Sequence, residues 1–168
     1  MINSESLSQL FPSLEEIPAE HRLDAPIHQV SYVINGDMVP WTGATKTVLS
    51  PVCIRHADGS VTQAEIGSHP EMGVTESDQM LEAAVAAYNN GRGEWPTMGV
   101  AGRFDCMQAF VKQVVAQRTL IVKLIMWEVG KSLADSRKEF DRTVDYIQAT
   151  VEALKEMDNA NSRFIVVE

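Results

Sequence analysis

The chain has 168 residues and a mass of 18.6 kDa, which corresponds to about one domain. Apolar residues make up 45% and charged residues 22%, as in ordinary globular domains, and this composition excludes a wholly disordered chain. The 23 acidic residues outnumber the 14 basic ones, and the net charge of −9 argues against nonspecific binding to nucleic-acid phosphates. A small anionic substrate held by one or two arginines is compatible with this charge.

Neither the cysteines nor the histidines have the spacing of a metal site. Cys53 and Cys106 are far apart in sequence and form no C-x-x-C pair, and Cys106 is expected to be buried within a helix. The four histidines are expected at the surface: His21, His28, His56 and His69. We predict no signal peptide and no membrane span, since no apolar run approaches about 20 residues, and we expect a reducing cytoplasmic location.

The first 67 residues are predicted to contain a lead-in followed by strands. Residues 1–28 are acidic and interrupted by prolines, which leaves room for about one helical turn near Leu14. Over residues 29–67 apolar and polar positions alternate. The pairs Asn35-Gly36 and Asp58-Gly59 tolerate the positive φ angles of tight turns, so this region is predicted to form short antiparallel ribbons.

Helical spacing replaces the alternation after this region. A first helix is predicted from a capping residue, Thr75, to the terminating sequence Asn89-Asn90-Gly91. Two consecutive helices are predicted over about 101–117 and 119–129, because the apolar face shifts between them. Gly130 is a suitable residue to end the second of these.

The last predicted helix, 136–157, has the clearest amino-terminal signal. Ser136 and Glu139 are spaced as a capping box. One apolar stripe follows at intervals of three and four residues: Phe140, Val144, Ile147, Val151 and Leu154. The polar residues 158–161 are predicted to end this helix, and residues 162–168 to form a strand. The predicted fold class is therefore α+β, with β-ribbons, a layer of about four helices and a carboxy-terminal strand.

Two glycine-containing sequences are predicted not to bind nucleotides. Gly130-Lys131-Ser132 resembles the end of a P-loop, but Ile125 stands where the pattern needs another glycine, and a helix precedes it instead of a strand. Gly91-Arg92-Gly93 lacks the third glycine of a dinucleotide fingerprint and also follows a helix. No set of residues with catalytic spacing emerges from the sequence, so no catalytic residue is assigned.

Arg142 is the one candidate binding residue. It lies about 200° around the helix from Phe140, at 100° per residue, and is therefore predicted to project away from the apolar stripe. Its acidic neighbours, Glu139, Asp141 and Asp145, favour an exposed arginine in ion pairs within the helix.

Taken in order, these segments resemble the amino-terminal part of the aldehyde dehydrogenase superfamily. Residues 32–37 (YVINGD) resemble its opening hairpin, and residues 65–68 (EIGS) the strand before its first helix. The alanine-rich stretch 83–95 is similar to its first long helix, and residues 124–132, with WEVGKS, to a later helix end. The resemblance covers about residues 29–168.

Within the superfamily, two segments are most similar to the NADP-dependent, non-phosphorylating glyceraldehyde-3-phosphate dehydrogenases. These are residues 123–128 (KLIMWE) and 139–143 (EFDRT). The resemblance implies that Arg142, in the E-x-x-R-T segment, helps to bind the substrate phosphate. A guanidinium suits this role because it is always charged and can bind a phosphate through two hydrogen bonds.

The resemblance also implies that the chain is an amino-terminal fragment of an α/β enzyme. The family's catalytic cysteine, general-base glutamate and cofactor site would lie beyond residue 168. In the parent enzyme a thiol attacks the aldehyde, a hydride passes to NADP, and the thioester is hydrolysed to 3-phosphoglycerate. A homo-oligomer with a phosphorylated aldehyde as its small-molecule partner is expected, with no activity in the fragment alone. The alternative is a stand-alone, non-catalytic helical module for partner binding or oligomerisation.

Overall fold

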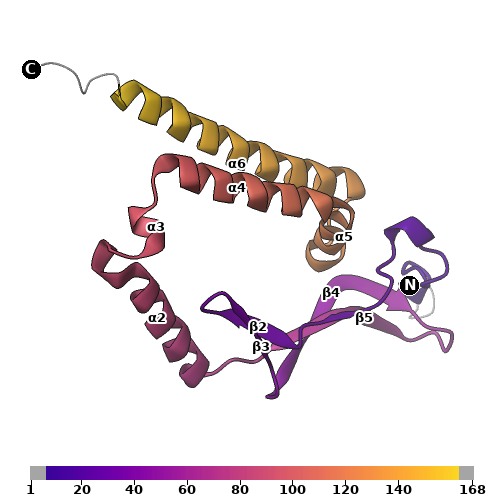
Figure 1. Ribbon diagram of the computed structural model, residues 1–168. Helices are drawn as coiled ribbons and strands as arrows, with labels where there is room; N and C mark the ends of the chain where they lie inside the picture. Colours follow the sequence, from indigo (N-terminus) through magenta and orange to yellow (C-terminus); the bar gives the residue numbers. More distant parts are fainter. Residues whose placement is uncertain (1–6, 163–168) are drawn as a thin grey trace, which may run out of the picture.

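A computed structural model describes residues 7–162, and the chain passes from two small sheets to a layer of helices (Figure 1). The elements in chain order are η1 Ala19–His21, β1 Ile27–His28, β2 Ser31–Ile34, β3 Asp37–Pro40, β4 Thr45–Arg55, β5 Val61–Pro70, α2 Val74–Tyr88, η2 Asn89–Gly91, α3 Glu94–Thr97, α4 Val100–Ala116, α5 Arg118–Val129 and α6 Leu133–Ser162. Within the described range, none of the helices combines the length and apolarity needed to cross a membrane. The predicted α+β class is confirmed.

The predicted antiparallel ribbons are confirmed in both sheets. Strands β2 and β3 form a hairpin whose turn, Asn35-Gly36, has φ angles of 57° and 86°. The second sheet has the order β1-β5-β4, in which β4 and β5 are antiparallel and β1 is parallel to β5. Gly67 is required where β1 meets β5, because a Cβ atom there would lie 2.0 Å from the carbonyl oxygen of Ile27.

The helical layer is built on α4, α5 and α6. Figure 1 shows α6 running alongside α4, with α5 turning at their shared end towards β4. A buried cluster joins the three helices: Val111, Val122, Phe140 and Val144. The two consecutive helices predicted over 101–117 and 119–129 are thus confirmed. The predicted apolar stripe of the last helix faces inward from Phe140 to Val151, whereas its last member, Leu154, is 37% exposed.

A second buried cluster joins the sheet to the helices and includes the lead-in. Ile54, Ile66 and Trp127 form its centre, and Ile17 and Leu23 of the lead-in pack against them. The indole N–H of Trp127 also donates a 2.7 Å hydrogen bond to the carbonyl oxygen of His21. The lead-in therefore covers the junction of β4, β5 and α5. The helical turn predicted near Leu14 is instead a hydrogen-bonded turn.

The boundaries of α6 differ from the predicted 136–157. Ser132 caps the helix, since its Oγ accepts the N–H of Asp135 at 3.1 Å and donates to that carboxylate at 2.7 Å. Ser136, the predicted cap, is fully buried within the helix. Residues 158–161 continue the helix. Each aspartate or asparagine lowers helix stability by less than about 1 kcal/mol relative to alanine, and no glycine or proline intervenes. Of the strand predicted over 162–168, Ser162 belongs to α6 and the remainder lies outside the described residues.

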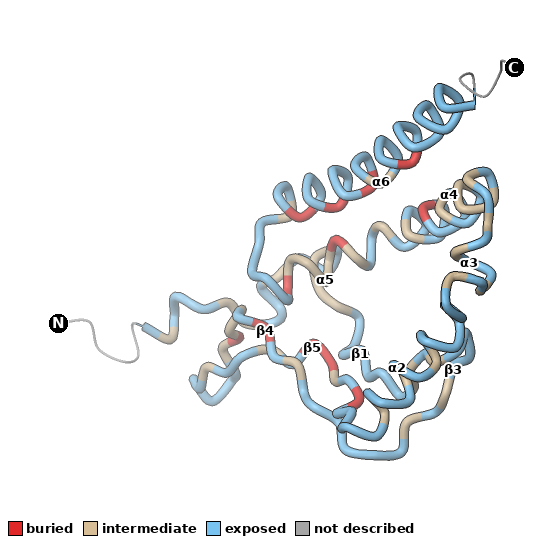
Figure 2. Tube along the Cα trace, turned by 90° about the vertical axis from the view of Figure 1, so that its left-hand side faces the viewer, coloured by how far each residue is buried: buried red, intermediate tan, exposed pale blue. Residues whose placement is uncertain are grey.

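Helix α2 also starts differently from the prediction. Its N-cap is Gly73 rather than Thr75, and the Gly73 N–H donates to the carboxylate of Glu76 at 2.8 Å. The predicted end is confirmed, because Asn89 adopts a left-handed conformation with φ 47°. Figure 2 shows buried residues in α5, α6 and the β4–β5 ribbon, whereas α2 has none.

Candidate functional site

The connection between α5 and α6 places the charged residues of the candidate site. Gly130 adopts a left-handed conformation, with φ 73° and ψ 32°, and its N–H donates to the carbonyl oxygen of Met126 at 3.0 Å. The predicted helix end is therefore confirmed. Lys131 follows in the short connection, and Ser132 then starts α6.

Two acidic neighbours of Arg142 are already paired with other cations. Lys131 donates to the carboxylate of Glu139 across the α5–α6 connection. Arg118 binds Asp141 through two hydrogen bonds of 2.8 and 2.7 Å. These bonds from Arg118 hold the pKa of the Asp141 carboxyl below its ordinary value and raise the pKa of the Arg118 guanidinium. Neither carboxylate is thus committed to Arg142.

Arg142 itself is exposed, whereas Phe140 on the same helix is buried. The predicted outward projection is confirmed. The ion pairs expected from its neighbours are not formed, because no described carboxylate lies within salt-bridge distance of its guanidinium. Its guanidinium instead lies over the ring of Tyr146, with 5.8 Å between the guanidinium carbon and the ring centroid. The role of Arg142 in binding substrate stays a prediction.

A surface hollow of about 560 Å³ surrounds this arginine on α6. It is lined by Lys131, Asp135, Lys138, Glu139, Arg142, Thr143 and Tyr146. Lys131 is neutralised by Glu139, and Asp135 accepts the hydroxyl of Ser132. Lys138 and Arg142 remain without a carboxylate at salt-bridge distance among the described residues. The hollow can therefore accept an anion, in a chain whose net charge is −9.

The cysteines and histidines do not add to this site. Cys53 is half-buried in β4, and Cys106 is exposed on α4, so its predicted burial is wrong. The cause is the one-sided packing of α4, where Val111 is the buried residue. None of the four histidines is buried, as predicted. Over residues 7–162 no group of three histidine, cysteine, aspartate or glutamate side chains is placed to hold a metal ion.

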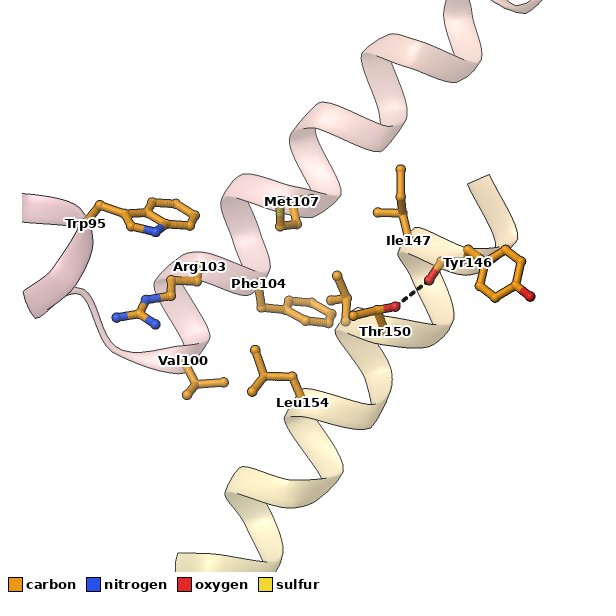
Figure 3. A pocket seen from close by; sticks show the side chains of 10 residues that line it. Trp95, Val100, Arg103, Phe104, Met107, Tyr146, Ile147, Thr150 and Leu154 are labelled. Atoms are coloured by element: carbon orange, nitrogen blue, oxygen red, sulfur yellow. Dashed lines mark hydrogen bonds between the residues drawn. The ribbon is translucent and has the colours of Figure 1, made fainter. Parts of the chain in front are cut away.

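A second hollow, of about 450 Å³, lies between α4 and α6 (Figure 3). Its lining is mostly apolar and includes Phe104, Met107 and Leu154. Arg103 flanks it, with its guanidinium 5.8 Å from the ring centroid of Trp95 and bonded to the carbonyl oxygen of Pro96 at 3.1 Å. This groove presents no group of titratable side chains placed for catalysis. The candidate site is therefore the hollow around Arg142.

Comparison with known proteins places the chain in a family. The profile of the Aldehyde dehydrogenase family matches residues 54–165, a span that includes Arg142. No curated protein matches the chain. The fold resembles that of an NAD-dependent aldehyde dehydrogenase from Sinorhizobium meliloti, with a TM-score of 0.61 and 22% sequence identity. That match covers 84% of this chain and 26% of the other, so the chain spans about a quarter of its structural relative. Because the family profile matches more than half of the sequence, the chain belongs to the aldehyde dehydrogenase family.

Proposed function

We propose that this chain forms the amino-terminal part of an aldehyde dehydrogenase that oxidises glyceraldehyde 3-phosphate to 3-phosphoglycerate with NADP. Family membership supports the reaction class, and the fold relative is described as NAD-dependent. The preference for NADP and for a phosphorylated aldehyde rests on the resemblance of residues 123–128 and 139–143 to that type of enzyme.

One observation carries the choice of substrate. The guanidinium of Arg142 is exposed and unpaired with any described carboxylate, although three acidic residues lie within three positions of it. Glu139 and Asp141 bind Lys131 and Arg118 instead. An arginine kept free in this way can bind a phosphate dianion through two charge-assisted hydrogen bonds.

Neither glycine-containing sequence has the setting of a dinucleotide cradle. Gly91-Arg92-Gly93 begins at the end of η2, directly after α2, and Gly130-Lys131-Ser132 follows α5. A dinucleotide cradle instead follows a strand. The proposal therefore gives this chain a part in substrate binding and assigns cofactor binding to the remainder of a complete enzyme. The isolated 168-residue chain is expected to give no NADP reduction with glyceraldehyde 3-phosphate.

The test is the substitution Arg142→Ala in a complete enzyme carrying this segment. Hydrogen bonds to charged groups contribute about 1.5–3 kcal/mol, so KM for glyceraldehyde 3-phosphate should rise about ten- to a hundredfold. KM for unphosphorylated glyceraldehyde should stay unchanged, and Arg142→Lys should restore part of the loss. Arg137→Ala, another exposed arginine on α6, is the matched control.

Equal effects of Arg142→Ala on both aldehydes would contradict the proposal, as would no effect on either. In those cases Arg142 would be an ordinary exposed helix residue. Steady-state rates with NADP and with NAD on the same enzyme test the cofactor preference separately.

A further inference from the structure

Three side chains that line the hollow follow one another at intervals of one turn along α6. Lys138, Arg142 and Tyr146 occupy positions i, i+4 and i+8 and therefore share one face of the helix. Like charges at i and i+4 repel each other and destabilise a helix. Here neither cation has a carboxylate at salt-bridge distance in the described part of the chain. The arrangement suits binding of an anion better than it suits helix stability.

We propose that Lys138 is a second cation of the phosphate site and that Tyr146 is a positioning residue for Arg142. The ligand class is a phosphate monoester of a short-chain aldehyde. This inference rests on the proposed function, in which Arg142 contacts the phosphate.

The geometry of α6 allows both cations to contact one phosphate. Residues four apart rise by about 6 Å along a helix, and the lysine and arginine side chains are long enough to converge over that distance. Of the two carboxylates that line the hollow, Glu139 is bound by Lys131, whereas Asp135 keeps its charge and accepts the hydroxyl of Ser132. The ammonium of Lys138 adds a compact charge, while the guanidinium of Arg142 supplies the two-bond geometry.

Tyr146 is placed to hold the guanidinium rather than to pack in the core. Tyr146 is 64% exposed, and it lies at the boundary of the two hollows, since it lines both the groove between α4 and α6 and the hollow around Arg142. The ring centroid lies 5.8 Å from the guanidinium carbon of Arg142, which is a cation–π distance. This contact restricts the flexible arginine to the side of the helix that faces the hollow.

The experiment is a titration of the 168-residue chain with inorganic phosphate at constant ionic strength, followed by NMR. Arg142→Ala should weaken binding at least tenfold. Lys138→Ala and Lys138→Gln should each weaken it about five-fold, as expected for the loss of one nearby charge. Tyr146→Leu should weaken it about two- to five-fold, and Tyr146→Phe should restore it, since phenylalanine keeps the aromatic face.

Two controls separate a specific site from general charge. Lys155→Ala removes a lysine of the same helix that lies outside the hollow, 3.9 Å from Glu152, and should leave phosphate binding unchanged. Tyr146→Leu in the Arg142→Ala background should have no additional effect, because a positioning residue acts through the side chain that it positions. Circular dichroism of each variant checks that α6 is retained.

The outcomes distinguish the inference from the proposed function. Loss of binding in Arg142→Ala with no change in the Lys138 and Tyr146 variants would overturn the inference and leave the phosphate contact of Arg142 standing. Absence of saturable phosphate binding to the unchanged chain would overturn the two-cation site, while the proposed function keeps its separate kinetic test. An unchanged affinity in Arg142→Ala would contradict both.

Discussion

Two fully buried serines show how differently the same side chain can contribute to stability. The hydroxyl of Ser50, on β4, donates to the main-chain carbonyl of Trp127 near the end of α5 and accepts the N–H of Val52 at 3.0 Å. The hydroxyl of Ser136, on α6, has no hydrogen-bond partner among the described residues. Ser50 therefore connects the sheet to the helices, whereas Ser136 buries a polar atom without compensation.

We expect alanine at these two positions to have different effects. Ser50→Ala leaves a buried carbonyl and a half-buried N–H unpaired and should lower the free energy of unfolding by about 1–3 kcal/mol. Ser136→Ala removes only an unpaired hydroxyl and should be neutral or stabilising by up to about 1 kcal/mol. Urea unfolding of both variants, followed by circular dichroism, measures the difference. Equal losses of stability would contradict the assigned hydrogen bonds.

The direction of Arg142 could be predicted from sequence, but its lack of an ion pair could not. The 100° rotation per residue was sufficient to place Arg142 opposite Phe140. Glu139 and Asp141 are paired with Lys131 and Arg118, which lie 8 and 23 residues away along the chain. Such pairs depend on how α5 and α6 pack, and a search limited to one helix cannot find them.

The helices could be predicted more completely than their ends. Periodicity alone located α2, α4, α5 and most of α6. The start of α6 was misplaced by one turn because two capping patterns stand four residues apart, Ser132 with Asp135 and Ser136 with Glu139. Tertiary packing decides between them, since Ser136 is fully buried and Ser132 is exposed. The pairing of β1 with β5 joins residues about 40 positions apart, so no local sequence pattern predicts it.

The ion pair between Arg118 of α5 and Asp141 of α6 makes a pH-dependent contribution to stability. The two hydrogen bonds from Arg118 lower the pKa of Asp141 from its ordinary 3.8. A carboxyl with a lowered pKa in the folded state stabilises the fold above its unfolded pKa and loses that contribution as the pH falls through the folded value. The free energy of unfolding of the unchanged chain should therefore exceed that of the Asp141→Asn variant at pH 7. This difference between the two proteins, the gap, should close below about pH 4.

Denaturant unfolding of both proteins between pH 7 and pH 2.5 measures this gap. Asp145→Asn is the matched control on the same helix, because Asp145 has no ion pair in the described structure, and it should show no comparable pH-dependent gap. A constant difference between Asp141→Asn and the unchanged protein across this range would contradict the role of the pair.

The whole chain exposes far more surface than a compact monomer of its mass. Its accessible surface is 12481 Å², whereas about 8,200 Å² is expected for 18.6 kDa. Figures 1 and 2 show the cause, because α2 and the β2–β3 hairpin stand apart from the layer of α4, α5 and α6. Two small buried clusters therefore stabilise a fold with an extended, open shape.

Helix α2 has an exposed apolar face that no other described element covers. Leu81, Val85 and Tyr88 are 64%, 62% and 59% exposed, and their spacing of i, i+4 and i+7 puts them on one side of the helix. Contiguous exposed apolar surface favours association in water. We therefore predict that the 168-residue chain forms oligomers at micromolar concentration, measured by light scattering with size-exclusion chromatography.

Charge placed on this face should oppose the association. The double variant Leu81→Glu and Val85→Glu is expected to shift the chain towards monomer, because burying two carboxylates against an apolar partner is unfavourable. The control is Gln79→Glu with Ala86→Glu, which adds the same charge on the opposite side of α2, about 140–160° from Leu81. Since the added repulsion between copies is the same in both variants, a shift in the first alone assigns association to the apolar face. A monomeric unchanged chain, or equal shifts in both variants, would show that this face does not drive assembly.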